Sequence, residues 1–76
     1  MSSKHICILN FINSSDFNKE QYKQWIDRKK ITLDDICNYV LQKVWDNNKF
    51  SYWTMDFNLM RYYRQYTEEC LRILFD

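Results

Sequence analysis

One histidine and three cysteines are the side chains of this sequence that could bind a metal ion. His5 and Cys7 are close in the chain, whereas Cys37 and Cys70 are far from them and from each other. Together they supply the imidazole and thiolate ligands of structural zinc sites. No pair has CxxC or HxxxH spacing, however, and Cys37 and Cys70 each fall within an apolar helical pattern that is typical of a buried thiol. The sequence therefore predicts core cysteines, with no metal and no other cofactor.

His5 and Cys7 could also act as base and nucleophile, because residues two apart on a strand point to the same face. The apolar residues around them include no orienting carboxylate, and the chain has no glycine that would let backbone amides approach a substrate closely. The acid pairs Asp34-Asp35 and Glu68-Glu69 diverge if they lie on helices. We therefore expect no catalytic residues and no enzyme activity.

Basic residues gather at two places. The run 28–30 is Arg-Lys-Lys, and Lys49, Arg61 and Arg64 lie among tyrosines and tryptophan. Arginine interleaved with aromatic residues is typical of single-strand nucleic-acid binding. The whole chain has 11 basic and 10 acidic residues, so its net charge of +1 supplies no long-range field for a polyanion. A nucleic-acid-associated accessory subunit of a transcription or replication complex is therefore the alternative function.

Aromatic residues make up 18% of the chain, which is more than a core of this size can hide. Surplus tryptophan, tyrosine and arginine is typical of protein-protein interfaces. Phe57, Arg61 and Arg64 are spaced i, i+4 and i+7, so they share the outer face of a helix, and Trp53 precedes it. We predict that these four residues bind a protein partner, together with Tyr39, which we also expect to be exposed.

The clearest helix that must position these residues covers 33–45. Apolar side chains recur there at helical spacing, in one stripe: Leu33, Ile36, Cys37, Val40, Leu41, Val44 and Trp45. Thr32 is a natural N-cap, and Asp35 follows at the capping-box position. The stripe places Leu41 and Val44 at the centre of the core.

Two further helices flank this one. The first is expected from Ser15 or Asp16 to about Lys30, with a sparse apolar face. The second is expected from Thr54 to Leu74, with a central apolar stripe: Leu59, Tyr63, Tyr66, Cys70 and Leu74. Since the chain lacks glycine, left-handed turn positions should fall on asparagines 13, 47 and 48.

Two apolar segments are compatible with either helix or strand. Residues 5–12 are rich in β-branched side chains but could be helical, with Ser2 or Ser3 as the cap, and residues 49–55 alternate like a strand. The predicted fold is mainly α: a small three-helix bundle, formed by residues 1–76 as a single domain. Its apolar amino-terminal segment adds either a fourth short helix or a strand that pairs with 49–55 in a small α+β fold.

Cysteine usage and codon bias suggest where such a protein works. Three dispersed cysteines indicate reduced thiols, hence an intracellular setting in the cytoplasm or nucleus of a host cell. The apolar runs are too short to cross a bilayer. The absence of alanine, glycine and proline points to an AT-rich genome. We therefore expect a small viral or phage-encoded interaction module that docks on a larger protein complex and inhibits or scaffolds it. Self-association through the aromatic surface is a further possibility.

Overall fold

Four helices form the fold of residues 3–76, the part of the chain that the computed structural model describes. They are α1 (Ser3–Ile12), α2 (Lys19–Asp27), α3 (Leu33–Asn48) and α4 (Phe57–Phe75). Residues 3–76 contain no strand, so the expected mainly helical bundle is confirmed in the form with a fourth short helix. The strand alternative for residues 5–12 and 49–55 is wrong. Residues 5, 8 and 12 are buried at i, i+3 and i+7, which is a helical and not an alternating pattern.

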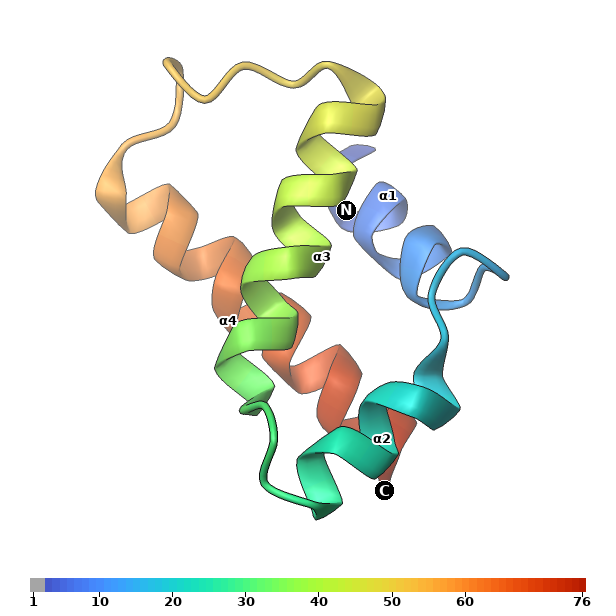
Figure 1. Cartoon of the computed structure of the whole chain (residues 1–76). Helices are drawn as coiled ribbons and strands as arrows, with labels where there is room; N and C mark the ends of the chain where they lie inside the picture. The colour runs from blue at the N-terminus through green and yellow to red at the C-terminus, as the bar shows by residue number, and fades with distance from the viewer. Residues whose placement is uncertain (1–2) are drawn as a thin grey trace.

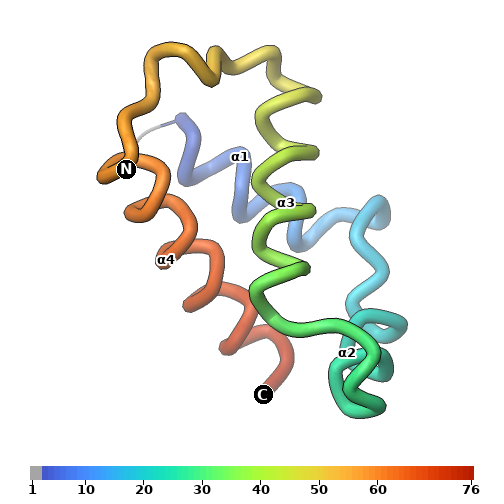
Figure 2. Tube along the Cα trace, turned by 60° about the vertical axis from the view of Figure 1, so that its left-hand side comes forward, coloured from blue at the N-terminus to red at the C-terminus, as the bar shows by residue number. Residues whose placement is uncertain are grey.

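Helices α3 and α4 lie side by side and make the most extensive contact between elements. Helix α1 packs against both of them, lying behind α3 in Figure 1. The short α2 lies at the end of the bundle next to the carboxyl terminus and contacts α4, while the segment between α3 and α4 arches over the opposite end (Figure 2). Within residues 3–76, we find no helix with the length and apolar character needed to cross a membrane.

Side-chain caps set the starts of three helices. The predicted capping box of α3 is confirmed: the Asp35 amide donates to Thr32 Oγ1, and the Thr32 amide donates to the Asp35 carboxylate. Helix α4 starts at Phe57 and not at Thr54, because Asp56 is the residue whose side chain accepts from the Leu59 amide. Helix α2 likewise starts after Asn18, later than expected. Of the two serines expected to cap α1, Ser3 is its first residue and Ser2 lies outside the described residues.

The left-handed backbone positions fall on Lys29 and Lys49, not on the expected asparagines. Asn48 is still helical and uses its side-chain amide to donate to the carbonyl of Val44 at 2.8 Å. Asn13 makes the same kind of bond to the carbonyl of Leu9 at 3.0 Å. The left-handed residue that ends α3 is therefore its C-cap Lys49, one position after Asn48.

The core lies where α1, α3 and α4 meet. Its buried apolar side chains are Ile8, Ile12, Phe17, Ile36, Cys37, Val40, Val44, Trp45, Tyr63 and Leu71. On α4 the buried residues are Tyr63, Thr67 and Leu71, so the stripe predicted through Tyr66 and Cys70 forms its half-buried flank. Thr67 is buried because its hydroxyl donates to the Tyr63 carbonyl at 2.8 Å, which satisfies its polar group within the helix. Val40 and Val44 are central on α3, whereas Leu41 is half-buried at the edge.

Candidate functional site

A groove runs between α3 and α4 beneath the segment that joins them, and its volume is about 500 Å³. Most of its lining is apolar. Helix α3 contributes Asn38, Leu41, Gln42 and Trp45, the joining segment contributes Tyr52 and Met55, and α4 contributes Phe57, Met60, Arg61, Tyr63 and Arg64. Three of the five residues predicted to bind a partner therefore line one groove: Phe57, Arg61 and Arg64.

Trp45 and Tyr63 join the groove to the core. Both side chains are buried, and their rings meet edge to face with centroids 5.4 Å apart. Trp45 also holds the joining segment, because its indole Nε1 donates to Met55 Sδ at 2.9 Å and its ring packs edge to face on Phe50. The inner end of the groove is therefore formed by side chains of the packed core.

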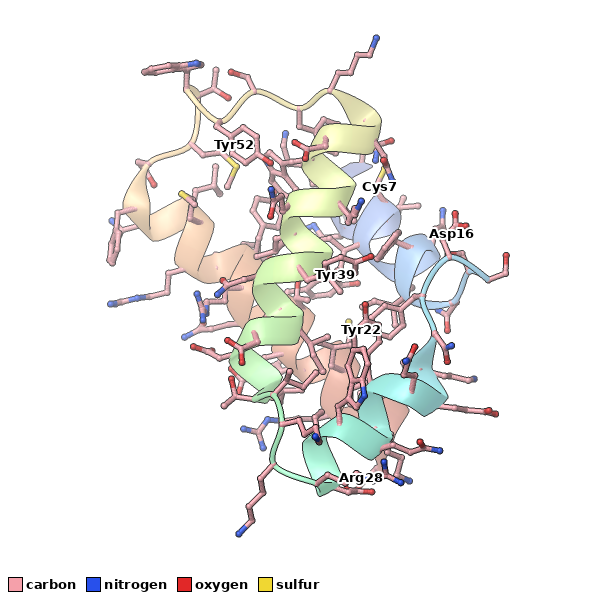
Figure 3. All side chains as sticks on the ribbon, in the orientation of Figure 1. Cys7, Asp16, Tyr22, Arg28, Tyr39 and Tyr52 are labelled. Carbon is pink, nitrogen blue, oxygen red and sulfur yellow. The ribbon has the colours of Figure 1, made fainter. Side chains whose placement is uncertain are left out.

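Trp53 lies at the exposed side of the joining segment and does not line the groove. Its neighbour Tyr52 is held near α3, as Figure 3 shows, by donating to the Asp46 carboxylate at 3.0 Å. Tyr52 and Met55 are thus both tied to α3, and Trp53 between them is 98% exposed. The expected exposure of Trp53 and of Phe57, which is 71% exposed, agrees with the structure.

Arg61 and Phe57 form a pair on the α4 wall. The Arg61 guanidinium lies 5.1 Å from the centroid of the Phe57 ring, a cation–π contact between residues one turn apart. The Arg61 side chain is exposed, and no carboxylate of residues 3–76 forms an ion pair with it. This pair therefore presents an aromatic ring and an uncompensated positive charge at the groove.

Arg64 has a different role from Arg61, although both lie on the same wall. Its guanidinium forms an ion pair with Asp34 and donates to Asn38 Oδ1 at 2.9 Å, so it links α4 to α3. The hydrogen bond from Arg64 holds the pKa of the Asp34 carboxyl below its usual value, and the same bond raises the pKa of Arg64. The charge of Arg64 is thus compensated within the fold.

Tyr39 does not join the other predicted residues, because it lies on the side of α3 away from the groove lining. Figure 3 shows it beside Tyr22 of α2, with ring centroids 5.8 Å apart, and it also contacts Phe11 of α1 at 6.4 Å. Burial and the contact with Tyr39 raise the pKa of Tyr22 to about 12. Tyr39 is half-buried in an aromatic cluster that joins three helices, so the expectation that it is exposed is wrong.

The candidate metal ligands lie in separate surroundings. The His5 ring is buried among Tyr62, Tyr63 and Tyr66, at centroid distances of 5.3, 5.2 and 4.6 Å. Cys7 is near Asn48, to which its thiol donates at 3.6 Å. Within residues 3–76, no three histidine, cysteine or acidic side chains are placed so that they could share a metal ion.

The thiols of Cys37 and Cys70 are also embedded in the protein. Burial raises the pKa of Cys37 to about 11, and burial likewise raises the pKa of Cys70. Since α1 is a helix, Cys7 and His5, two residues apart, diverge instead of sharing a face. The raised pKa values make Cys37 and Cys70 poor nucleophiles at neutral pH, because the reactive form is the thiolate.

Sequence reasoning missed several residues of the groove. Leu41 was expected at the centre of the core, and Met55 in a segment compatible with either helix or strand, but both line the groove together with Met60. For Met60 a signal existed: together with Phe57, Arg61 and Arg64 it makes an i, i+3, i+4, i+7 pattern. The roles of Leu41 and Met55 depend on how α3, α4 and the joining segment pack together, which no local pattern shows.

Searches of protein-family models, of curated proteins and of solved structures found no match to this chain.

Proposed function

We propose that this protein is a non-enzymatic interaction module that docks on another protein, within a larger complex that it inhibits or scaffolds. Its docking face comprises the α3–α4 groove and the exposed residues Trp53, Phe57 and Arg61. One observation carries the proposal: an apolar groove, whose inner end is closed by the buried Trp45 and Tyr63, is lined by three exposed large apolar side chains, Tyr52, Phe57 and Met60.

The distribution of exposed apolar side chains favours this face. Six of the nine large apolar residues exposed within residues 3–76 fall in one stretch of sequence: Tyr52, Trp53, Phe57, Leu59, Met60 and Tyr62. Three of them, Tyr52, Phe57 and Met60, line the groove, and exposed large apolar side chains gathered at a groove are typical of interaction sites. Aromatic residues, methionine and arginine are also the types that interface centres favour.

The way the face is held supports binding as well. Met55 is bonded to Trp45, Tyr52 to Asp46, and Arg64 to Asp34, so α3, α4 and the segment between them are tied at several points. A surface that is already ordered before binding loses less conformational entropy on association. The compensated Arg64 adds little net charge to the face, which favours a protein surface over a nucleic-acid backbone.

Site-specific photo-crosslinking tests the proposal. A photoreactive phenylalanine analogue replaces Trp53 in one sample and Ile73 in the other, because Ile73 is also strongly exposed, at 79%, but lies near the far end of α4. In extracts of the cells that produce the protein, we expect position 53 to crosslink a discrete protein that position 73 does not.

A double variant shows whether the crosslink depends on the docking face. Phe57→Ala/Arg61→Glu changes two exposed residues and spares Arg64, whose ion pair belongs to the fold. It should melt like the parent and lose the crosslink, whereas Arg28→Glu, with the same charge change on an exposed residue beyond α2, should keep it. Equal crosslinking from positions 53 and 73, or a crosslink that survives the double variant, would contradict the proposal.

A further inference from the structure

The charged side chains on the lining of the groove are basic, while the carboxylates of Asp34 and Asp46 lie beside it, bonded to Arg64 and Tyr52. Among the described residues that line it, Arg61 and Arg64 are charged, and none is acidic. The side chains of Asn38, Gln42 and Tyr52 supply neutral polar groups. A ligand that enters the groove therefore meets apolar surface and positive charge, and it meets no carboxylate on the lining.

The two arginines differ in how far their hydrogen-bond donors are already used within the fold. Arg64 already donates to Asp34 and Asn38, so binding another anion would cost it these bonds to α3. The Arg61 guanidinium lies over the Phe57 ring, 5.1 Å from its centroid, and forms no ion pair within residues 3–76. A guanidinium has five N–H donors in a planar fork that can bind a carboxylate in a bidentate geometry. Arg61 is thus the residue of the groove with which an acidic side chain of a partner can form an ion pair without breaking one in the fold.

The apolar part of the groove indicates what the ligand carries besides its acidic group. Trp45 and Tyr63 are buried next to it, and Leu41, Met55 and Met60 line it. A volume of about 500 Å³ is within the range of ordinary ligand pockets, and methionine side chains adapt to the shape of an apolar guest. This part of the groove therefore suits large apolar side chains of a partner.

The architecture also restricts the conformation of a bound segment. Residues 3–76 contain no strand, so they offer no sheet edge to which an extended peptide could add. Two packed helices with an apolar groove between them instead suit a third helix, which inserts its apolar face. On a helical ligand, an apolar and an acidic side chain three or four positions apart lie next to each other. Phe57, Met60 and Arg61 have the same spacing on α4, so the two ligand side chains can contact the apolar surface and Arg61 together.

We infer that the groove binds an amphipathic helix of the partner protein, whose apolar residues fill the space beside Trp45 and Tyr63 and whose acidic residue pairs with Arg61. The inference rests on the proposed function and adds the chemistry of the partner. It assigns Arg61 as the residue that selects acidic partners, Phe57 as the ring that positions its guanidinium, and Arg64 as a structural tie between helices.

Selection from a peptide library tests this chemistry directly. The library displays 16-residue helical peptides with apolar residues on one face and randomised flanking positions, and the baits are the parent protein, Arg61→Glu and Arg28→Glu. We expect the parent and Arg28→Glu to enrich peptides with Asp or Glu beside an apolar residue, and Arg61→Glu to enrich Lys or Arg there. The Arg28→Glu bait controls for the change in net charge.

A double-mutant cycle then shows that the acid pairs with Arg61. For one selected peptide, changing its acidic residue to the amide should weaken binding to the parent about tenfold, which corresponds to a close charge pair. The same change should have little effect on binding to Arg61→Ala. An equal loss against parent and Arg61→Ala, or a lack of acidic enrichment on the parent, would overturn the inference.

The outcomes separate this inference from the proposed function. If the selected peptides bind the parent but not Phe57→Ala, and carry no acidic residue, the proposed docking face is supported and only the inference of an acidic partner is contradicted. Failure to select any peptide that depends on Phe57 would count against both. A dimer of the parent in sedimentation at micromolar concentration, converted to monomer by Phe57→Ala, would identify a second copy of the chain as the occupant and would also overturn the inference.

Discussion

His5 of α1 and Tyr62 of α4 share a hydrogen bond of 2.8 Å between the imidazole Nε2 and the phenolic oxygen, across 57 residues of sequence. The His5 ring is buried, and the rings of Tyr63 and Tyr66 also contact it. The bond therefore fixes the amino-terminal helix onto α4 and satisfies a polar atom that has been taken out of water. It explains why the single histidine of the chain, which could have been a metal ligand or a base, is part of the core.

Removing the Tyr62 hydroxyl should destabilise the protein. We expect Tyr62→Phe to lower the free energy of unfolding by about 1 kcal/mol, because a buried ring nitrogen loses a partner. Urea denaturation followed by circular dichroism measures the change. Tyr52→Phe is the matched control: it removes a hydroxyl bonded to Asp46 at an exposed site, so it should have a smaller effect. If the two variants lost the same free energy of unfolding, the buried His5–Tyr62 bond would contribute no more to stability than an exposed one.

Truncation of Leu71 should be far more damaging than truncation of Leu41. Leu71 is fully buried, so Leu71→Ala should cost about 2–5 kcal/mol through lost burial and a cavity. The whole protein holds only about 5–15 kcal/mol in total, so this variant should lose a large share of its stability and melt well below the parent. Leu41 is half-buried beside the groove, and Leu41→Ala should stay folded. Thermal melts compare the two, and a Leu41→Ala variant that melts below Leu71→Ala would contradict the described core.

The capping box at the start of α3 should contribute measurably to stability. Thr32→Ala removes the side-chain oxygen that accepts from the Asp35 amide, and we expect a loss of about 1 kcal/mol. Thr32→Ser retains that oxygen and should remain close to the parent. Denaturant titrations of the three proteins provide the measurement. If serine and alanine at position 32 were equivalent, the cap would not be the cause of the loss.

The buried Cys37 thiol should make the protein less stable at alkaline pH. Burial raises the pKa of Cys37 from 9.0 to about 11 in the folded protein, so the unfolded chain releases this proton first. The contribution of Cys37 to stability is therefore complete below pH 9 and is lost as the pH rises toward 11. Comparison of parent and Cys37→Val between these values isolates this effect from tyrosine ionisation, including that of Tyr22. We expect the unfolding free energy of the parent to fall more steeply with pH, and parallel curves would contradict this.

Much of the secondary structure could be predicted from local patterns. The stripe from Leu33 to Trp45 and the Thr32–Asp35 capping box locate α3 nearly to its ends, since helix period and N-terminal capping act within a few residues. The start of α4 could not be placed as well. Thr54 and Asp56 are both residue types that cap helices well, and Asp56 is the cap in the structure. The residue before it, Met55, is bonded to Trp45 of α3, a tertiary contact that a local pattern does not reveal.

On the outer face of α4, the exposure of side chains could be predicted from the sequence, but their ion pairs with other helices could not. The exposure of Phe57 and Arg61 followed from their helical spacing, because residues at i and i+4 share a face wherever the helix lies. The same spacing included Arg64 but could not reveal that Asp34 compensates its charge. Whether an arginine on a face is available to a partner depends on what the adjacent helix presents, and that is not a property of its own helix.

By itself, the sequence determined that the protein is helical, which residues cap α3, and which positions of α4 share a face. These properties depend on interactions between residues within about one turn of each other, so they can be read along the chain. The tertiary structure alone decided that Leu41, Met55 and Met60 meet in a groove, that Tyr39 packs on Tyr22 and Phe11, and that His5 is buried against Tyr62. Each of these depends on how separate helices pack, because burial and charge compensation come from side chains that are distant in sequence and adjacent in space.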